Sequence, residues 1–478
     1  MKKKQIALLL SAVMLLAGMT GCGASAGQAS AGQGGTEQGE TAETNAAEPE
    51  SGTDQTDTAA EDGESRETQH LTFWYGLNGS PGEALQKVID DYNNSQDKVF
   101  VEAQYQGSYE ETLNKLKTAV RTQEGPDIVQ IYEAGTRAMI DSGFIIPMQE
   151  LIDEYDIDTS HLEENILNYY TIDDQLYSMP LNTSIPVCYY NKTVLSQIGY
   201  EEGPQSWEDI LEISKQVTEQ GLATAGFAMT NTIWCFEQPM VQEHYAMVDN
   251  DNGRSGRATK TVFADGDMAV NIVSTLQEIY ENGYGADVGF TVDANKAAFC
   301  AGEAVITCDS SGSLKAFLDT IGDSFELGVC EFPPLSTDSE NGGVTLGGAS
   351  IYVCDNGREG ANEAIADFIK YMISPEVQGE FSVSTGYFPI TTEAYDQQVV
   401  KDNFEQYPQY QVITDALHKS ENMGFGPLYA SIVECRSVYQ KYLEQAMMGE
   451  ITPEECVSKS AEEANAIIAD YNMANPVE

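Results

Sequence analysis

Residues 181–192 have the sequence Leu-Asn-Thr-Ser-Ile-Pro-Val-Cys-Tyr-Tyr-Asn-Lys. Asn182, Thr183 and Ser184 form a small polar cluster, and the strand-forming residues Val187 to Tyr190 follow it, so a loop of hydrogen-bonding groups runs straight into a strand. Alternating strands and helices of one compact unit precede this stretch, and a second unit of similar size follows it. The pattern therefore predicts a crossover between two units, where a crevice collects the convergent polar groups that hold a ligand.

The segment before this stretch alternates predicted strands with predicted helices. Helix starts are indicated at Ser80 and Ser108, because each serine precedes a glutamate by three residues, as in a capping box. This order is typical of a largely parallel sheet whose ligand side lies at the carboxyl ends of the strands, and Tyr109 and Glu133 both fall at that side. The predicted strands are Leu71–Tyr75, Val99–Tyr105 and Ile128–Tyr132.

The segment after the crossover also mixes helices and strands. A predicted strand, Ala304–Cys308, stops at Asp309, and Ser310 and Ser311 then lead toward a further helix. Serine before a helix can offer its hydroxyl and free N–H groups to an anion or a sugar, although a plain N-cap uses the same residue type. Gly347 and Gly348 precede another predicted strand and permit a close backbone approach to a ligand, without the lysine that a P-loop requires.

The bulk composition narrows the function classes. At 478 residues the chain is too long for a single core, so two or more packing units are expected. The formal charge of −52 argues against nucleic acid as a partner and against adhesion to anionic lipid through protein charge. The nine cysteines contain no C-x-x-C pair and the four histidines are scattered, so no metal or other cofactor is predicted. Most cysteines are predicted to be buried and to pack as small hydrophobic residues. Disulfides stay an alternative, because an exported protein meets oxidising conditions.

The N-terminus has the features of an export signal. Lys2 to Lys4 precede an apolar run that is too short for a stable membrane span. Met19 to Cys22 resemble the bacterial lipobox, which implies that residues 1–22 form a lipoprotein signal peptide with Cys22 lipidated; the alternative is an ordinary signal peptide. Residues 23–70 are predicted to be a disordered acidic linker, because they lack the apolar side chains that would offset the entropy of ordering. We therefore expect the body at the extracytoplasmic face of the bacterial cell membrane, held by a lipid anchor.

The body resembles the extracellular solute-binding proteins of ATP-binding-cassette (ABC) importers. The resemblance implies an α/β fold of the two-lobed periplasmic-binding-protein type (type II), with the ligand cleft between lobes joined by hinge strands, one of them through Tyr189 and Tyr190. It also implies a monomer that binds a small polar solute, presents it to the transmembrane subunits of a permease and catalyses no reaction. The resemblance covers nearly all of residues 71–472 and is carried by Phe73-Trp74, Tyr189–Lys192, Ala301–Ala304, Ser374–Glu376 and Thr385–Tyr387.

The expected lobe boundaries follow from the crossover. Lobe 1 is expected at about 71–184 plus about 350–385, and lobe 2 at about 185–349 plus about 386–478. The expected mechanism is closure of the lobes around the solute, in which the closed state is favoured by the difference in its contacts with the ligand.

Within the family, several runs resemble the branch that binds sn-glycerol-3-phosphate. In the roles that this implies, Glu133 accepts from vicinal hydroxyls, Trp234 covers the carbon skeleton and Arg436 takes a phosphate bidentately. The matching runs are Gly107–Glu110, Gln130–Thr136, Ser310–Leu314, Gly347–Ser350 and Thr385–Thr391. The implied ligand contacts are Tyr109, Glu133, Ser184 or its alternate Thr183, Trp234, Ser310 or Ser311, Gly347 or Gly348, Tyr387 and Arg436.

Two departures from that branch leave the ligand open. Asn231 stands where the branch has the first of two tryptophans, and Tyr75 replaces a histidine. The candidates are glycerol-3-phosphate, a glycerophosphodiester or, as the alternative, a neutral sugar or oligosaccharide. Arg436 has a second interpretation as the ion-pair partner of a neighbouring acid such as Glu434. An exported hydrolase would need paired carboxylates, which the acidic composition can supply, but no nucleophile or metal motif points to one.

Overall fold

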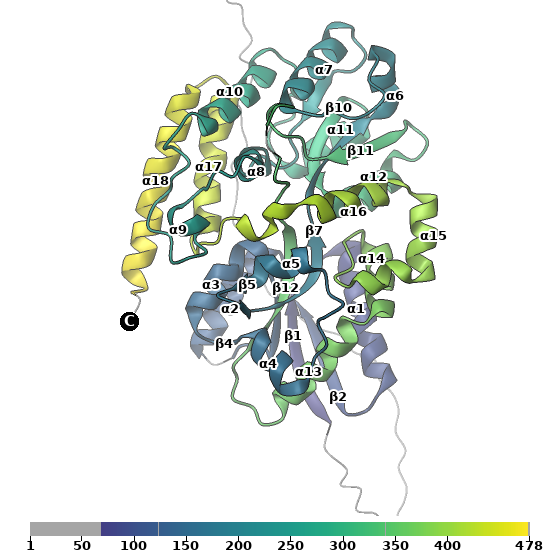
Figure 1. Cartoon of the computed structure of the whole chain (residues 1–478), viewed down its shortest axis with the longest axis vertical. Helices are drawn as coiled ribbons and strands as arrows, with labels where there is room; N and C mark the ends of the chain where they lie inside the picture. Colours follow the sequence, from purple (N-terminus) through teal and green to yellow (C-terminus); the bar gives the residue numbers. More distant parts are fainter. Residues whose placement is uncertain (1–67, 123, 340, 477–478) are drawn as a thin grey trace, which may run out of the picture. The chain divides into compact units, whose positions relative to one another are not determined.

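The computed structural model describes residues 68–122, 124–339 and 341–476, which belong to one compact unit of the chain. The predicted signal peptide, the lipidation site Cys22 and residues 23–67 of the predicted linker lie outside the described residues. The described chain builds two lobes, each with its own sheet (Figure 1). We call the lobe around the six-stranded sheet the first lobe and the lobe around the four-stranded sheet the second lobe.

The six-stranded sheet runs in the order β2-β1-β3-β12-β4, with β7 paired to β12. Strand β1 is parallel to β2 and β3, whereas β12 is antiparallel to β3, β4 and β7. Leu71, Phe73 and Tyr75 alternate along β1 on its buried face, as the two-residue period of a strand requires. The three strands predicted before the crossover are confirmed. The strands are β1 (Gln69–Tyr75), β2 (Val99–Tyr105), β3 (Ile128–Tyr132), β4 (Ile145–Ile146), β7 (Met179–Ser184) and β12 (Gly347–Cys354), and a separate hairpin joins β5 (Thr171–Ile172) to β6 (Gln175–Leu176).

Helices pack against this sheet and against one another. The capping box predicted at Ser108 is confirmed, because the Glu111 N–H donates to the Ser108 hydroxyl over 3.2 Å and the Ser108 N–H donates to the Glu111 carboxylate over 2.7 Å. The box predicted at Ser80 is wrong: the Gly82 N–H donates to the Asn78 carbonyl, so Ser80 already lies inside the first turn. The elements are α1 (Gly79–Ser95), α2 (Tyr109–Thr122), η1 (Glu133–Gly135), α3 (Thr136–Ser142), α4 (Met148–Tyr155), α5 (Glu164–Tyr170), α13 (Ala361–Met372) and α14 (Pro375–Thr385).

The chain passes from one sheet to the other at Ile185. Strand β7 ends at Ser184 in the first sheet, and β8 begins at Pro186 in the second sheet, whose order is β11-β8-β10-β9. The predicted crossover is therefore confirmed. The predicted hinge strand through Tyr189 and Tyr190 is not, because both residues lie inside β8, which pairs with β10 on one side and with β11 on the other. The strands are β8 (Pro186–Asn191), β9 (Ala225–Ala228), β10 (Ala304–Ser310) and β11 (Leu327–Glu331).

The remaining helices lie mostly in the second lobe, where α10, α17 and α18 pack together along one side (Figure 1). None of the described helices is long and apolar enough to cross a membrane. These elements are α6 (Lys192–Leu195), η2 (Ser196–Ile198), α7 (Trp207–Glu219), α8 (Trp234–Gln242), α9 (Asp249–Asn252), α10 (Met268–Glu281), α11 (Val292–Cys300), η3 (Ser311–Ser313), α12 (Leu314–Ile321), η4 (Thr392–Asp396), α15 (Gln398–Gln406), α16 (Gln409–Lys419), η5 (Glu421–Phe425), α17 (Ile432–Met447) and α18 (Pro453–Ala474).

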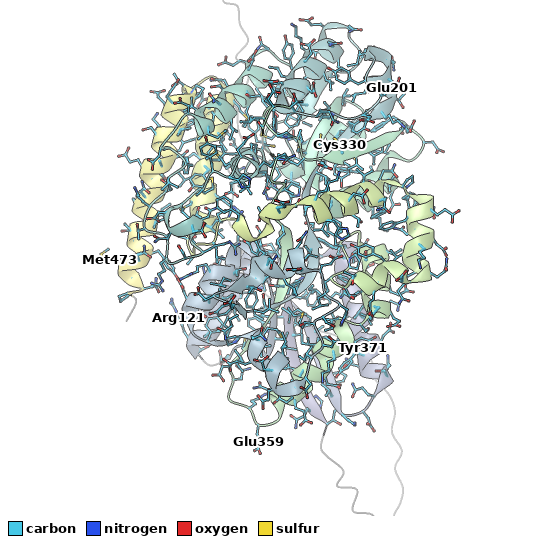
Figure 2. The ribbon with its side chains drawn as sticks, in the orientation of Figure 1. Arg121, Glu201, Cys330, Glu359, Tyr371 and Met473 are labelled. Atoms are coloured by element: carbon cyan, nitrogen blue, oxygen red, sulfur yellow. The ribbon has the colours of Figure 1, made fainter. Side chains whose placement is uncertain are left out.

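All eight cysteines in the described part of the chain are free thiols, and six of them are buried, as predicted for small hydrophobic residues. Cys330, labelled in Figure 2, lies in β11 opposite Cys188 of β8, and Cys188 also lies opposite Cys308 of β10. Burial raises the pKa of the Cys188 and Cys308 thiols well above its usual range, so they stay protonated and unreactive.

Candidate ligand-binding site

A cavity of about 370 Å³ lies where the two lobes meet. Eight of the eleven residues predicted to contact a ligand line it, and they come from both lobes. These eight are Tyr109, Glu133, Ser184, Trp234, Ser310, Gly348, Tyr387 and Arg436. The wall is completed by Glu110, Tyr132, Ala134, Asn231, Ile233, Val433, Ser437 and Gln440.

The other three predicted residues lie behind the wall. Thr183 is fully buried, and its carbonyl accepts from the Phe388 N–H over 3.0 Å. The Ser311 hydroxyl accepts from the Ile185 N–H over 3.1 Å, and the Ser311 N–H donates to the Ile185 carbonyl over 2.8 Å, so Ser311 fastens the crossover. Gly347 lies against Trp234, where a Cβ atom would approach the indole to 2.8 Å. These positions support the cavity without lining it.

Gly348 is required at its position by two independent constraints. Its φ of +100° lies in the region that side chains rarely adopt. A Cβ atom there would also lie 2.0 Å from the Asn182 carbonyl oxygen, on the neighbouring strand β7. The glycine therefore allows β7 and β12 to approach closely at the edge of the cavity, and its part-exposed backbone forms a section of the wall.

Hydroxyl groups form one section of the wall, through Tyr109, Ser184, Ser310 and Tyr387. Tyr109 opens α2, and the Asn182 side-chain amide donates to its hydroxyl over 2.8 Å. Burial, with Tyr387 close by, raises the pKa of Tyr109 well above its ordinary value, and burial likewise raises the pKa of Tyr387. Both phenols therefore stay protonated near neutral pH and can donate to a ligand.

Three further contacts hold these hydroxyl groups in place. Gln130 donates through its amide to the Asn182 side-chain oxygen over 2.7 Å, so the support of Tyr109 extends into β3. The Tyr109 ring also stacks on Tyr132, with 5.6 Å between ring centroids and 10° between ring planes. Ser310 caps η3, because its hydroxyl accepts from the Gly312 N–H over 3.1 Å. The hydroxyl wall is thus fixed by side chains of both lobes.

Arg436 and two glutamates form the charged section of the site. The Arg436 Nη1 donates to Glu133 over 2.9 Å, from α17 of the second lobe to η1 of the first lobe. The Arg436 Nε and Nη2 donate to both carboxylate oxygens of Glu237 over 2.8–3.2 Å. Two predictions for Arg436 are corrected by these contacts: Glu237 occupies the bidentate edge that was assigned to phosphate, and the exposed Glu434 is not the ion-pair partner.

The charges of this cluster are strongly coupled. Burial alone would lower the pKa of Arg436, but Glu237 and Glu133 outweigh it and raise that pKa well above its usual value. The side chain of Glu237 is 1% exposed, that of Glu133 10% and that of Arg436 17%. With two carboxylates and one guanidinium, the cluster carries one net negative charge next to the ligand cavity.

The sequence did not identify Glu237 as part of the site, and it singled out Asn231 only because this residue replaces a tryptophan of the related branch. Glu237 lies three residues after Trp234 on α8, a spacing that places both side chains on one face of the helix. That spacing was a usable signal for Glu237, although it does not identify Arg436 as the partner. Asn231 caps the start of α8, since its side-chain oxygen accepts from the Trp234 N–H over 3.1 Å. Within the described residues, no three His, Cys, Asp or Glu side chains are placed to hold a metal ion.

A second set of polar contacts joins the lobes. Arg257 of the second lobe pairs with Asp141 of α3 over 3.0 Å, and Arg137 pairs with the same carboxylate over 2.8 Å. Arg254 donates to the Tyr169 carbonyl over 3.0 Å and lies 4.7 Å from the centroid of the Tyr169 ring. Arg254 and Arg257 therefore join the second lobe to the first outside the cavity.

Comparison with known proteins places these features in a family. The sequence model of a family described as bacterial extracellular solute-binding protein matches residues 87–411. The chain is 27% identical over 416 residues to the sn-glycerol-3-phosphate-binding periplasmic protein UgpB of Yersinia pseudotuberculosis, which covers 85% of this chain and 93% of the relative.

Solved structures show the same fold. UgpB from Mycobacterium tuberculosis, in complex with glycerophosphocholine, is similar with a TM-score of 0.71 and 20% identity, over 85% of this chain and 100% of the other. The cyclic alpha-maltosyl-1,6-maltose binding protein from Arthrobacter globiformis is similar with a TM-score of 0.69 and 18% identity, over 84% of this chain and 100% of the other. The predicted two-lobed α/β fold is confirmed by these similarities and by the two sheets.

Proposed function

The chain belongs to the bacterial extracellular solute-binding proteins, and on that premise we propose that it captures glycerol-3-phosphate or a glycerophosphodiester and delivers it to an ABC permease. As a member of this family it is the solute-binding component of an importer and not an enzyme. The observation that carries the proposed ligand is the cavity itself, which combines a carboxylate–guanidinium pair with a wall of neutral hydrogen-bond donors. The relatives named for sn-glycerol-3-phosphate support the same ligand class.

The two sections of the cavity suit the two halves of such a ligand. Glu133 accepts and Arg436 donates, so together they can bind vicinal hydroxyls of a glycerol group. The phosphate then faces Tyr109, Ser184, Ser310 and Tyr387, whose hydroxyls donate to its oxygens without competing for a proton. Trp234 offers an apolar face to the carbon skeleton. Binding would close the lobes because each half of the ligand contacts residues of both lobes.

We further propose how this body is organised and held. Lobe 1 comprises about 71–184 plus about 350–385, and lobe 2 comprises about 185–349 plus about 386–478. Lipidated Cys22 anchors a monomer to the extracytoplasmic face of the membrane, and the segment between Cys22 and β1, which begins at Gln69, serves as the tether. Expression of the full chain with radiolabelled palmitate tests the anchor: label in the native chain and none in Cys22→Ala is expected, and label in both would remove Cys22 as the site.

Titration calorimetry with glycerol-3-phosphate, glycerophosphocholine and maltotriose tests the ligand. We expect heat of binding with at least one of the two phosphates. Ser184→Ala should weaken that binding by about fivefold, since a lost hydrogen bond contributes about 1 kcal/mol. Thr183→Val is the matched control, because Thr183 is adjacent but does not line the cavity. Binding of maltotriose alone, or equal loss in both variants, would contradict the proposal.

A neutral sugar is the second candidate, and one observation favours it. Glu237 already occupies the bidentate edge of Arg436, so the strongest phosphate-binding geometry in the site is taken. The remaining carboxylate, guanidinium and hydroxyl groups also suit a sugar, and a structurally similar protein is named for an oligosaccharide. The calorimetric comparison with maltotriose decides between the two classes.

A further inference from the structure

We propose that Glu237 is a specificity-determining residue of the cleft, which makes the site prefer a phosphodiester with one negative charge over a phosphomonoester with two. The inference rests on the proposed function, because it concerns which polyol phosphate the same cavity takes. Glu237 acts through Arg436 and does not line the cavity itself, so it is a positioning residue for the ligand site.

The geometry of the Arg436 guanidinium limits how it can bind a phosphate. A guanidinium has five N–H groups, and a phosphate is best held by the two parallel N–H bonds of one edge. In Arg436 the Nε–Nη2 edge faces both oxygens of Glu237, and one N–H of Nη1 faces Glu133. One N–H of Nη1 and one N–H of Nη2 are left over. Arg436 can therefore donate to a ligand oxygen, but it cannot offer the Nε–Nη2 edge while Glu237 holds it.

The cluster of Arg436, Glu133 and Glu237 also leaves one negative charge beside the cavity. Glu237 is fully buried, so water does not screen its carboxylate as it would at the surface. Arg436 cancels one of the two carboxylates, and one negative charge remains beside the cavity. A phosphomonoester carries between one and a half and two negative charges near pH 7, whereas a phosphodiester carries one. The residual field therefore opposes the monoester more strongly than the diester.

The other groups that face the phosphate are neutral. Tyr109, Ser184, Ser310 and Tyr387 donate through neutral hydroxyls. Neutral donors satisfy phosphate oxygens without adding positive charge, so they do not compensate the second charge of a monoester. Lys296 is engaged elsewhere, since its ammonium pairs with Asp309 over 2.8 Å and donates to Ser313 over 2.9 Å. The hydroxyl wall thus suits a singly charged phosphate.

The test compares two ligands on three variants. Calorimetry at 0.15 M ionic strength and pH 7.5 gives the ratio of the dissociation constants of glycerophosphoglycerol, a diester with one negative charge and no cationic group, and glycerol-3-phosphate. We expect the native protein to prefer the diester. Glu237→Gln removes the buried negative charge with little change of shape, and should shift the ratio toward the monoester on the order of tenfold. Glu237→Asp keeps the charge and should leave the ratio within about threefold of the native value.

Glu434→Gln is the matched control, because it removes the same charge from an exposed neighbour of Arg436 on α17 that does not line the cavity. Solvent screening should limit its effect to less than about twofold. Thermal unfolding of each variant confirms that it is folded before titration.

The outcomes separate this inference from the proposed function. If the native protein binds neither phosphate, the proposed function fails and the inference fails with it. If it binds both but prefers the monoester, or if Glu237→Gln leaves the ratio unchanged, the inference alone is overturned. A shift in Glu237→Asp as large as in Glu237→Gln would also overturn it, since geometry and not charge would then decide.

Discussion

Replacing Arg436 by methionine should destabilise the protein much more than a surface ion pair would. Glu237 is fully buried, and Arg436 donates to both of its carboxylate oxygens. Without the guanidinium, Glu237 becomes an uncompensated buried charge. Breaking a buried pair in this way costs about 3–5 kcal/mol, whereas exposed pairs contribute about 0–1 kcal/mol. We therefore expect Arg436→Met to lower the free energy of unfolding by about 3–5 kcal/mol.

The same reasoning predicts that losing the contact between Glu133 and Arg436 costs much less stability than leaving the buried Glu237 without its partner. Glu133→Gln removes one 2.9 Å contact from a carboxylate at the cavity wall, so it should cost about 1 kcal/mol. The double variant Arg436→Met/Glu237→Met removes both buried charges together. It should recover most of the stability lost in Arg436→Met, because a buried pair replaced by apolar groups of similar volume is nearly neutral.

Urea unfolding followed by tryptophan fluorescence measures these differences. Trp207 is a suitable reporter because it is buried in the second lobe and packs on Phe227 and Phe332. A loss of less than about 1 kcal/mol in Arg436→Met would refute the claim that Glu237 needs its partner. A double variant as unstable as the single variant would show that Arg436 stabilises the fold by packing and not by charge.

Three further outcomes follow from the geometry. Asp141→Asn weakens the ion pair with Arg257, so the lobes of the ligand-free protein should separate more easily. Small-angle X-ray scattering should show a larger radius of gyration, and the ligand affinity should fall by about fivefold. An unchanged radius of gyration would contradict this. Gly348→Ala places a Cβ 2.0 Å from the Asn182 carbonyl oxygen, at a φ of +100°. Thermal unfolding should therefore show that the free energy of unfolding falls by more than about 2 kcal/mol. An unchanged free energy of unfolding would refute the constraint on Gly348. The Cys188 thiol, whose pKa burial raises, should not react with Ellman's reagent at pH 8 until urea unfolds the protein, so the folded native protein and Cys188→Ala should show the same number of reactive thiols. One reactive thiol fewer in folded Cys188→Ala would contradict the protonated burial of Cys188.

Local patterns were enough to predict much of the fold. The three strands before the crossover and the capping box at Ser108 depend on residues close in sequence, and the structure contains them. The capping box predicted at Ser80 is wrong because α1 begins earlier, at Gly79. The Gly82 N–H donates to the Asn78 carbonyl and so closes the first turn before Ser80 can cap it. The hinge assigned to Tyr189 and Tyr190 failed for a different reason. Strand-forming residues indicate a strand, but they do not indicate which neighbours pair with it.

At three places the sequence predicted two neighbouring residues as alternative ligand contacts. In each of the pairs Thr183/Ser184, Ser310/Ser311 and Gly347/Gly348, one member lines the cavity and the other lies behind the wall. For the pairs in strands, the reason is that successive residues point to opposite faces of the sheet. Both members of each pair have similar chemistry, so composition cannot indicate which of them faces the ligand.

The pairing of Arg436 with Glu237 could not be derived from a single sequence. The two residues are 199 positions apart, and the chain offers many acids as partners. Proximity in sequence favoured Glu434, but that side chain is exposed, while the buried face of α17 meets α8. Long-range ion pairs are decided by helix packing, which depends on the whole core and not on the local pattern.

The interlobe contacts bear on how tightly any ligand can bind. The chain carries 76 acidic residues against 24 basic ones, so two lobes with acidic surfaces repel each other. Yet Arg254, Arg257 and Arg436 of the second lobe all donate to acceptors of the first lobe. We expect these contacts to offset the repulsion and to favour closure of the lobes. Because the apparent affinity scales with the population of the closed state, we expect part of the affinity to depend on arginines that need not touch the ligand.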